Sequence, residues 1–155
     1  MRYLSSITKH SVNPNFLLIT LLLLASSLPI ACNKEIKVND SDIIYISRKE
    51  MQKQLDKKQS KKHPIIIIDP RSEDEYIIGH ITGAINIPLP EAKKDDPKLK
   101  EAKDIFIYGR YGEDPLAKAM CKKLLAFGYD QVRMYKGGLE EWQAREQPMT
   151  SGDKP

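Results

Sequence analysis

Short apolar runs alternate with segments of helical periodicity along most of the chain. The clearest run is Ile65–Ile68, four consecutive β-branched residues between Pro64 and Asp69. A continuous run of this kind, without apolar–polar alternation, is typical of a strand buried on both faces of a parallel sheet. The pattern predicts strands over residues 43–46, 64–69, 84–87, 104–108 and 131–135.

Helical segments are predicted between these strands. Asp114 is a favourable N-cap, and Pro115 suits the first helical position. The next residues place Leu116, Met120 and Leu124 at helical spacing, which gives this helix an apolar face. Further helices are predicted after Ser47, over 73–78 and over 139–145.

The alternation of strands and helices sets the fold class. It predicts an α/β domain with a mostly parallel sheet of about five strands and with helices on both faces. Ligand sites in such sheets lie at the carboxyl ends of the strands. The loops after Asp69 and Tyr108 are therefore the first candidates for a functional site.

The N-terminal segment has a different pattern. Arg2 and Lys9 are the only lysine or arginine residues among the first 33, and an apolar block follows from Phe16 to Ala25. This block is shorter than the roughly 20 residues that a spanning helix needs. A basic start, a short apolar core and a small residue before a break predict a signal peptide over residues 1–31.

The break after Ala31 falls at Cys32, and residues 28–32 resemble the lipobox of bacterial lipoproteins. The segment departs from that pattern in having Pro29 where the family prefers leucine. The resemblance implies a diacylglycerol on Cys32, a tether over 32–42 and an exported, membrane-anchored domain. Asn33 after the cysteine favours the outer membrane where the envelope has two. An uncleaved anchor, or an ordinary signal peptide with an incidental Cys32, are the alternatives.

Charge and cysteine content limit the function classes. Removal of residues 1–31 would leave 124 residues with 23 basic and 21 acidic side chains. A balance this close to neutral does not indicate a nucleic-acid partner. The only other cysteine, Cys121, falls on the apolar side of a predicted helix, and no His/Cys cluster has the spacing of a zinc site. We therefore expect no disulfide, no metal and no cofactor, and a buried Cys121.

Several separated motifs resemble the rhodanese-like domain family. The segment Asp69–Arg71, followed by 75–84 and 86–88, resembles its first signature, and residues 137–142 resemble its C-terminal signature. The resemblance covers 43–149, which leaves 150–155 as an expected disordered tail. The signature positions are Asp69, Arg71, Gly79, His80, Gly83, Gly137, Gly138 and Trp142. We expect all of them to be structural, with Arg71 in an ion pair, His80 packed in a loop and Trp142 anchoring the last helix.

The resemblance also identifies the family's active-site loop. Rhodaneses transfer a sulfane sulfur through a cysteine persulfide, and that cysteine is the first residue of the loop. Here the position is Gly109, although Arg110 and Gly112 match the family pattern. The degenerate loop consists of Gly109, Arg110, Tyr111, Gly112, Glu113 and Asp114. Glycine has no side chain that could act as a nucleophile. The related cell-cycle phosphatases also need the loop cysteine, so Gly109 argues equally against a phosphatase.

Three functions remain open from the sequence. The leading interpretation is a catalytically silent, membrane-tethered rhodanese-like domain that acts as a binding or regulatory module. The first alternative is a thiosulfate sulfurtransferase that uses a non-standard nucleophile or a cysteine of a partner. The second is a small-molecule or anion-binding protein that uses the loop from Gly109 to Gly112 as a pocket, although Glu113 and Asp114 would disfavour anions.

Overall fold

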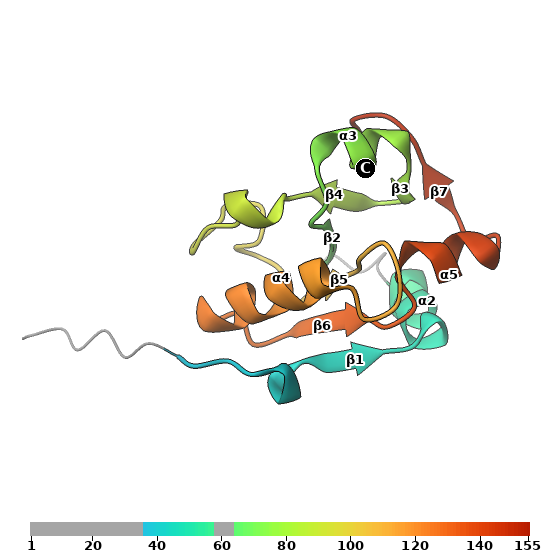
Figure 1. Cartoon of the computed structure of the whole chain (residues 1–155). Coiled ribbons are helices and arrows are strands. Elements are labelled where there is room, and N and C mark those ends of the chain that lie inside the picture. The colour runs from blue at the N-terminus through green and yellow to red at the C-terminus, as the bar shows by residue number, and fades with distance from the viewer. Residues whose placement is uncertain (1–35, 58–63) are drawn as a thin grey trace, which may run out of the picture. The chain divides into compact units, whose positions relative to one another are not determined.

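A five-stranded parallel sheet forms the centre of the domain (Figure 1). The computed structural model describes residues 36–57 and 64–155. The strands lie in the order β1-β6-β5-β2-β4, so β1 and β4 are the edges. Their bounds are β1 Ile44–Ile46, β2 Ile65–Asp69, β4 Ala84–Asn86, β5 Asp104–Ile107 and β6 Val132–Tyr135. The predicted fold class and all five predicted strands are confirmed, with ends that differ by one residue.

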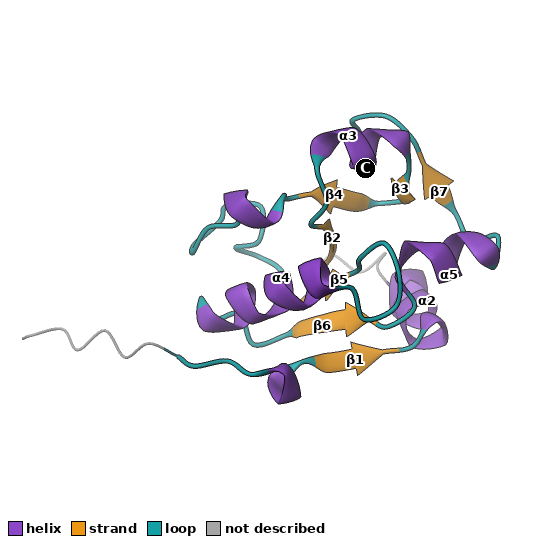
Figure 2. Ribbon diagram, viewed as in Figure 1, coloured by secondary structure: helices purple, strands orange, loops and turns teal. Residues whose placement is uncertain are grey.

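Helices cover both faces of this sheet, as predicted (Figure 2). Their bounds are α2 Arg48–Lys57, α3 Glu73–Ile78, α4 Pro115–Ala126 and α5 Gly138–Ala144, with short 3-10 turns η2 Asp40–Asp42 and η3 Leu89–Glu91. One apolar core joins α4 to the sheet through Met120, Cys121 and Leu124. A second core joins α2, α3 and α5 to the opposite face through Met51, Tyr76 and Trp142.

Alternate residues of the central strands contribute their side chains to one or the other of these two cores. Ile105 and Ile107 of β5 belong to the core under α4, whereas Phe106 and the following Tyr108 belong to the other. Successive side chains of a strand point to opposite faces, so a strand buried on both faces must be apolar at every position. This requirement explains the unbroken isoleucine run of β2.

A second, two-stranded sheet was not predicted. Strand β3, His80–Ile81, pairs in antiparallel fashion with β7, Met149–Thr150. Beyond it, the Gly152 N–H donates to the Ile77 carbonyl. The segment after Met149 therefore makes ordered contacts with α3 and β3, in contrast to the expected disordered tail. Two-residue strands are too short to leave a periodic signal in the sequence.

The predicted signal peptide and Cys32 lie outside the described residues, as do residues 33–35 of the predicted tether. Its described part includes η2, where the Asn39 N–H donates to the Asp42 carboxylate. No helix in the described ranges has both the length and the apolar character needed to cross a membrane.

Candidate functional site in the loop between β5 and α4

The loop that carries Gly109 connects the carboxyl end of β5 to the start of α4 and packs against the start of α5 (Figure 1). The Leu139 and Glu140 N–H groups donate to the Gly109 and Arg110 carbonyls, both at 2.9 Å. At Gly138, φ is +67°, and a Cβ there would lie 2.5 Å from the Tyr111 carbonyl group. The loop therefore requires glycine at Gly138, because only glycine permits this approach.

Asp114 occupies the space that a side chain on Gly109 would need. A Cβ atom built on Gly109 would overlap the Asp114 Cβ, and it would lie 2.6 Å from Cγ and 2.7 Å from Oδ2. Both residues are buried, with Asp114 only 2% exposed. The room expected for a small ligand at Gly109 is therefore filled by the protein itself.

The Asp114 carboxylate also accepts hydrogen bonds from the amides at this end of α4. Its Oδ1 accepts from the Leu116 N–H and its Oδ2 from the Arg110 N–H, both at 2.8 Å. The first bond is the N-cap that the sequence predicted. The second spans the loop and depends on Glu113, which adopts a left-handed φ of +55°. Two N–H groups that could face an anion thus already have a negatively charged acceptor.

The loop's charged side chains are paired. Arg110 donates from Nε and Nη2 to the two oxygens of Glu75, both at 2.6 Å. These hydrogen bonds hold the pKa of Glu75 below its ordinary value. Glu113 accepts from Lys118 at 3.0 Å, which lowers the Glu113 pKa, and lies 3.6 Å from Lys136. The Arg110 side chain is 45% exposed, but its charge is already paired with Glu75, which weakens its attraction for an incoming anion.

Beneath the loop, Asp69, Arg71 and Tyr108 form a buried polar cluster. Arg71 binds both Asp69 oxygens, with its shortest contact at 2.5 Å, and donates to the Gly79 carbonyl at 2.8 Å. The Tyr108 hydroxyl donates to Asp69 at 2.5 Å and accepts from the Ile81 N–H. Burial, reinforced by the Asp69 charge, raises the pKa of Tyr108 far above its ordinary value. Arg71 is therefore in the expected ion pair, and this cluster joins β2, β5 and β3.

The remaining signature residues fix the surrounding loops. His80 is buried and stacks on Tyr76, with Nδ1 2.9 Å from the Tyr76 carbonyl and Nε2 3.1 Å from the Lys154 carbonyl. Gly83 has a φ of +83°, in the left-handed region that favours glycine. Trp142 donates from Nε1 to the Pro148 carbonyl at 3.0 Å. Gly137 is the N-cap of α5.

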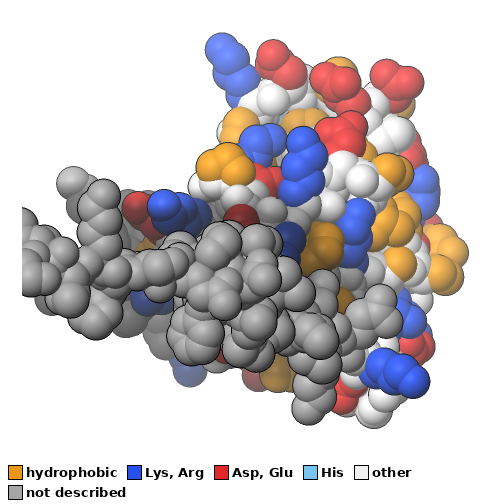
Figure 3. All heavy atoms as spheres, turned by 90° about the vertical axis from the view of Figure 1, so that its left-hand side faces the viewer, with side chains coloured by type: hydrophobic (Ala, Val, Ile, Leu, Met, Phe, Trp, Pro, Cys, Tyr) orange, Lys and Arg blue, Asp and Glu red, His pale blue; other side chains and the backbone are white. Residues whose placement is uncertain are grey.

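Cys121 lies within α4 and is 1% exposed. Burial raises the pKa of its thiol to about 12, so almost none of it is thiolate at neutral pH. Within the part of the chain that the structure describes, no group of three His, Cys, Asp or Glu side chains is placed to hold a metal ion. On the face in Figure 3, basic and acidic side chains are interspersed.

Two features of the site were missed from the sequence. One is the pairing of Arg110 with Glu75, which joins residues 35 positions apart. The other is the position of Asp114 against Gly109. The Asp-Pro pair indicated a helix cap, but no sequence signal indicated that the same carboxylate folds back over the loop.

Comparison with known proteins places this geometry in a family. The model described as Rhodanese-like domain matches residues 47–145. Over 90 residues the chain is 34% identical to the Candida albicans protein named Adenylyltransferase and sulfurtransferase UBA4, covering 53% of this chain and 20% of that protein. Over 84 residues it is 27% identical to Thiosulfate sulfurtransferase GlpE of Coxiella burnetii, covering 54% of this chain and 77% of that one.

A solved structure supports the fold independently. The BH2092 protein of Bacillus halodurans superposes with a TM-score of 0.60 at 20% identity, over 91% of this chain and 88% of that one. The family match covers more than half of the chain and includes the Gly109 loop. The chain therefore belongs to the rhodanese-like domain family.

Proposed function

We propose that this protein is a catalytically silent rhodanese-like domain that acts as a binding or regulatory module tethered to a membrane of the cell envelope. The observation that carries the proposal is the Gly109–Asp114 arrangement. The nucleophile position holds a glycine, and the Asp114 side chain fills the space beside it.

Sulfur transfer requires a thiolate and free N–H groups beside it, and we infer that this loop supplies neither. A thiolate must attack the donor and then hold the sulfur as a persulfide, and its charge must be stabilised by nearby N–H groups. In this loop the Arg110 and Leu116 N–H groups are bonded to Asp114. A carboxylate at this place repels thiosulfate, which is itself an anion.

The main alternative is sulfur transfer through another cysteine. It is favoured by the relatives, whose names describe sulfurtransferases. Cys121 is poorly suited to the role, because it is 1% exposed and faces the core under α4. A partner's cysteine would have to bring its thiolate to a loop that itself contains two carboxylates, Glu113 and Asp114.

Membrane tethering is the second part of the proposal. It rests on the sequence Ala31-Cys32 after an apolar segment and on its resemblance to a lipobox. A diacylglycerol on Cys32 would hold the domain at the exported side through the segment before β1. The same position suits a module that recruits or senses a partner at the membrane surface.

We expect the purified protein to show no thiosulfate:cyanide sulfurtransferase activity above the uncatalysed background. Cys121→Ala should give the same result, since this thiol has no access to the donor. The alanine variant is preferable to serine, because a buried hydroxyl without a partner costs about 1–3 kcal/mol. Turnover that is lost in Cys121→Ala would show that Cys121 is the nucleophile and that the protein is an enzyme.

Gly109→Cys should be poorly tolerated alone and rescued by Asp114→Gly. The new Cβ overlaps the Asp114 Cβ, and overpacking of this kind costs about 1–3 kcal/mol. Serine or alanine at Asp114 would keep the overlapping Cβ, whereas glycine removes it and is an acceptable N-cap. Urea unfolding of the wild type, both single variants and the double variant measures the coupling.

The same variants test the chemistry. The double variant has a nucleophile and unoccupied loop N–H groups, so we expect its thiosulfate turnover to exceed that of Gly109→Cys. Strictly additive effects on stability, together with equal turnover in the single and double cysteine variants, would contradict the proposed role of Asp114.

We expect Cys32 to carry the lipid. Cells grown with a labelled fatty acid should label the wild-type protein but not Cys32→Ala, and only the wild type should enter the membrane fraction as a processed chain. Cys121→Ala is the matched control and should be labelled like the wild type. Equal labelling of the wild type and Cys32→Ala would contradict the lipoprotein assignment.

A further inference from the structure

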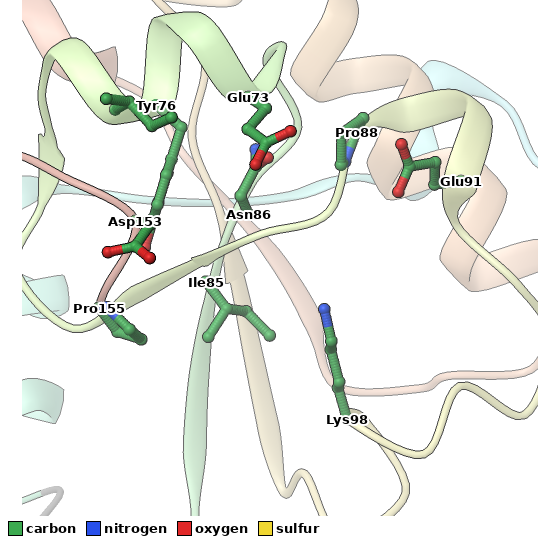
Figure 4. A pocket seen from close by; sticks show the side chains of 10 residues that line it. Glu73, Tyr76, Ile85, Asn86, Pro88, Glu91, Lys98, Asp153 and Pro155 are labelled. Atoms are coloured by element: carbon green, nitrogen blue, oxygen red, sulfur yellow. The ribbon is translucent and has the colours of Figure 1, made fainter.

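A second concave site lies away from the degenerate loop, beside the edge strand β4. It is a cavity of about 450 Å³, and α3, β4, the segment through η3 and the residues after β7 contribute its walls (Figure 4). None of residues 109–114 lines it. We call it the β4 cavity.

Uncompensated negative charge characterises the β4 cavity. Glu73, Glu91 and Asp153 line it, together with the single cation Lys98 (Figure 4). In the described ranges, none of these four side chains lies within 4.0 Å of an opposite charge in an ion pair. The carboxylates in the Gly109 loop, by contrast, are all paired. Because like charges in a concave site reinforce one another, the β4 cavity attracts a cation.

The lining is apolar as well as acidic. Ile85 of β4 and Ile77 of α3 contribute to its wall, and Ile77 is 40% exposed. Carboxylates around apolar side chains match an aliphatic stem that ends in a cation, which is the chemistry of a lysine or arginine side chain.

The sheet edge favours a polypeptide as the occupant. Strand β4 is the last strand of the sheet and has no strand on its outer side among the described residues. The Ile87 N–H bonds to Asp69 on the β2 side, so the backbone groups of Asn86 point to the free edge. An extended segment could bond there while its side chain enters the cavity, which is the geometry of recognition at a sheet edge.

The wall that carries Asp153 is held in place on both sides. The Gly152 N–H donates to the Ile77 carbonyl at 2.9 Å, and the Lys154 carbonyl lies 3.1 Å from His80 Nε2. His80 is itself buried and stacked on Tyr76, which also lines the cavity. Asp153 is therefore positioned before any partner arrives, which lowers the entropic cost of binding.

From this geometry we propose that the β4 cavity binds a lysine or arginine side chain presented by an extended segment of a partner protein. The inference rests on the proposed function as a binding module and names the chemistry of the partner. It concerns a surface separate from the Gly109 loop.

The test uses the full-length protein in detergent, labelled with ¹⁵N, and the peptide acetyl-Thr-Val-Arg-Val-Thr-amide. The matched control peptide has glutamine in place of arginine. The arginine peptide should shift the amide resonances of Ile85, Asn86 and Asp153 and leave those of residues 109–114 unchanged. The glutamine peptide should shift neither set.

Two variants, one that removes a negative charge from the cavity and one that removes its positive charge, distinguish charge recognition from a general loss of structure. Asp153→Asn should weaken binding of the arginine peptide by about threefold or more, the effect of one partly exposed charge pair. Lys98→Gln should strengthen it, because it removes a like charge. Glu101→Gln, an exposed carboxylate that does not line the cavity, is the control and should leave binding unchanged.

The remaining outcomes overturn the inference in identifiable ways. Equal binding of free spermidine, with no shift at Asn86, would show an amine site and not a peptide site. Absence of peptide binding, or no opposite effects of Asp153→Asn and Lys98→Gln, would overturn the cavity inference. Turnover of thiosulfate by the wild type would overturn the proposed function alone, so the two failures are distinguishable.

Discussion

The N–H groups at the start of α4 and in the loop before it favour a negatively charged acceptor, and in this protein Asp114 supplies it. The first amides of a helix have no partner within the helix, and the helix dipole adds to their preference for an anion. Here the carboxylate of Asp114 binds the Arg110 and Leu116 N–H groups and fills the space beside Gly109. The glycine at position 109 and the internal acceptor belong to the same arrangement, because a side chain on Gly109 would overlap Asp114.

The loop is held by hydrogen bonds from α5 and by a buried polar cluster. The start of α5 donates to the Gly109 and Arg110 carbonyls, and Gly138 permits the close approach to Tyr111. Below it, the buried Asp69 carboxylate is satisfied by Arg71 and Tyr108. A buried carboxylate is tolerated only with such partners. Loss of Arg71 or Tyr108 would leave the Asp69 charge without one of its partners and would destabilise the fold. These contacts therefore serve the stability of the fold independently of catalysis.

Helix α3 contributes side chains both to the Gly109 loop and to the β4 cavity. Glu75 of that helix neutralises Arg110 at the loop, whereas Glu73 faces the β4 cavity without an ion pair in the described residues. The helix thus separates a charge-paired loop from an acidic, apolar concavity. The segment after β7 completes this concavity and is anchored through Gly152 and through the contact of Lys154 with His80.

The sequence predicted features that depend on residues close together in the chain, and it did not predict those that join residues far apart. The isoleucine run of β2 and the Asp114-Pro115 start of α4 are local signals, and both predicted elements are confirmed. The β3–β7 pairing and the Arg110–Glu75 pair join residues far apart in the chain, and neither leaves a local pattern. The collapse of Asp114 onto Gly109 depends on the left-handed Glu113, a conformation that glutamate rarely adopts and that its identity does not indicate.

The central claim is that Asp114 already occupies the place of an anion in this loop. An NMR titration with thiosulfate, in the absence of any sulfur acceptor, measures this directly through the amide resonances of Arg110 and Leu116. The account predicts no saturable shift of these resonances in the wild type and a saturable shift in Asp114→Gly, whose amides are free. Saturable binding of thiosulfate to these amides in the wild type would contradict it.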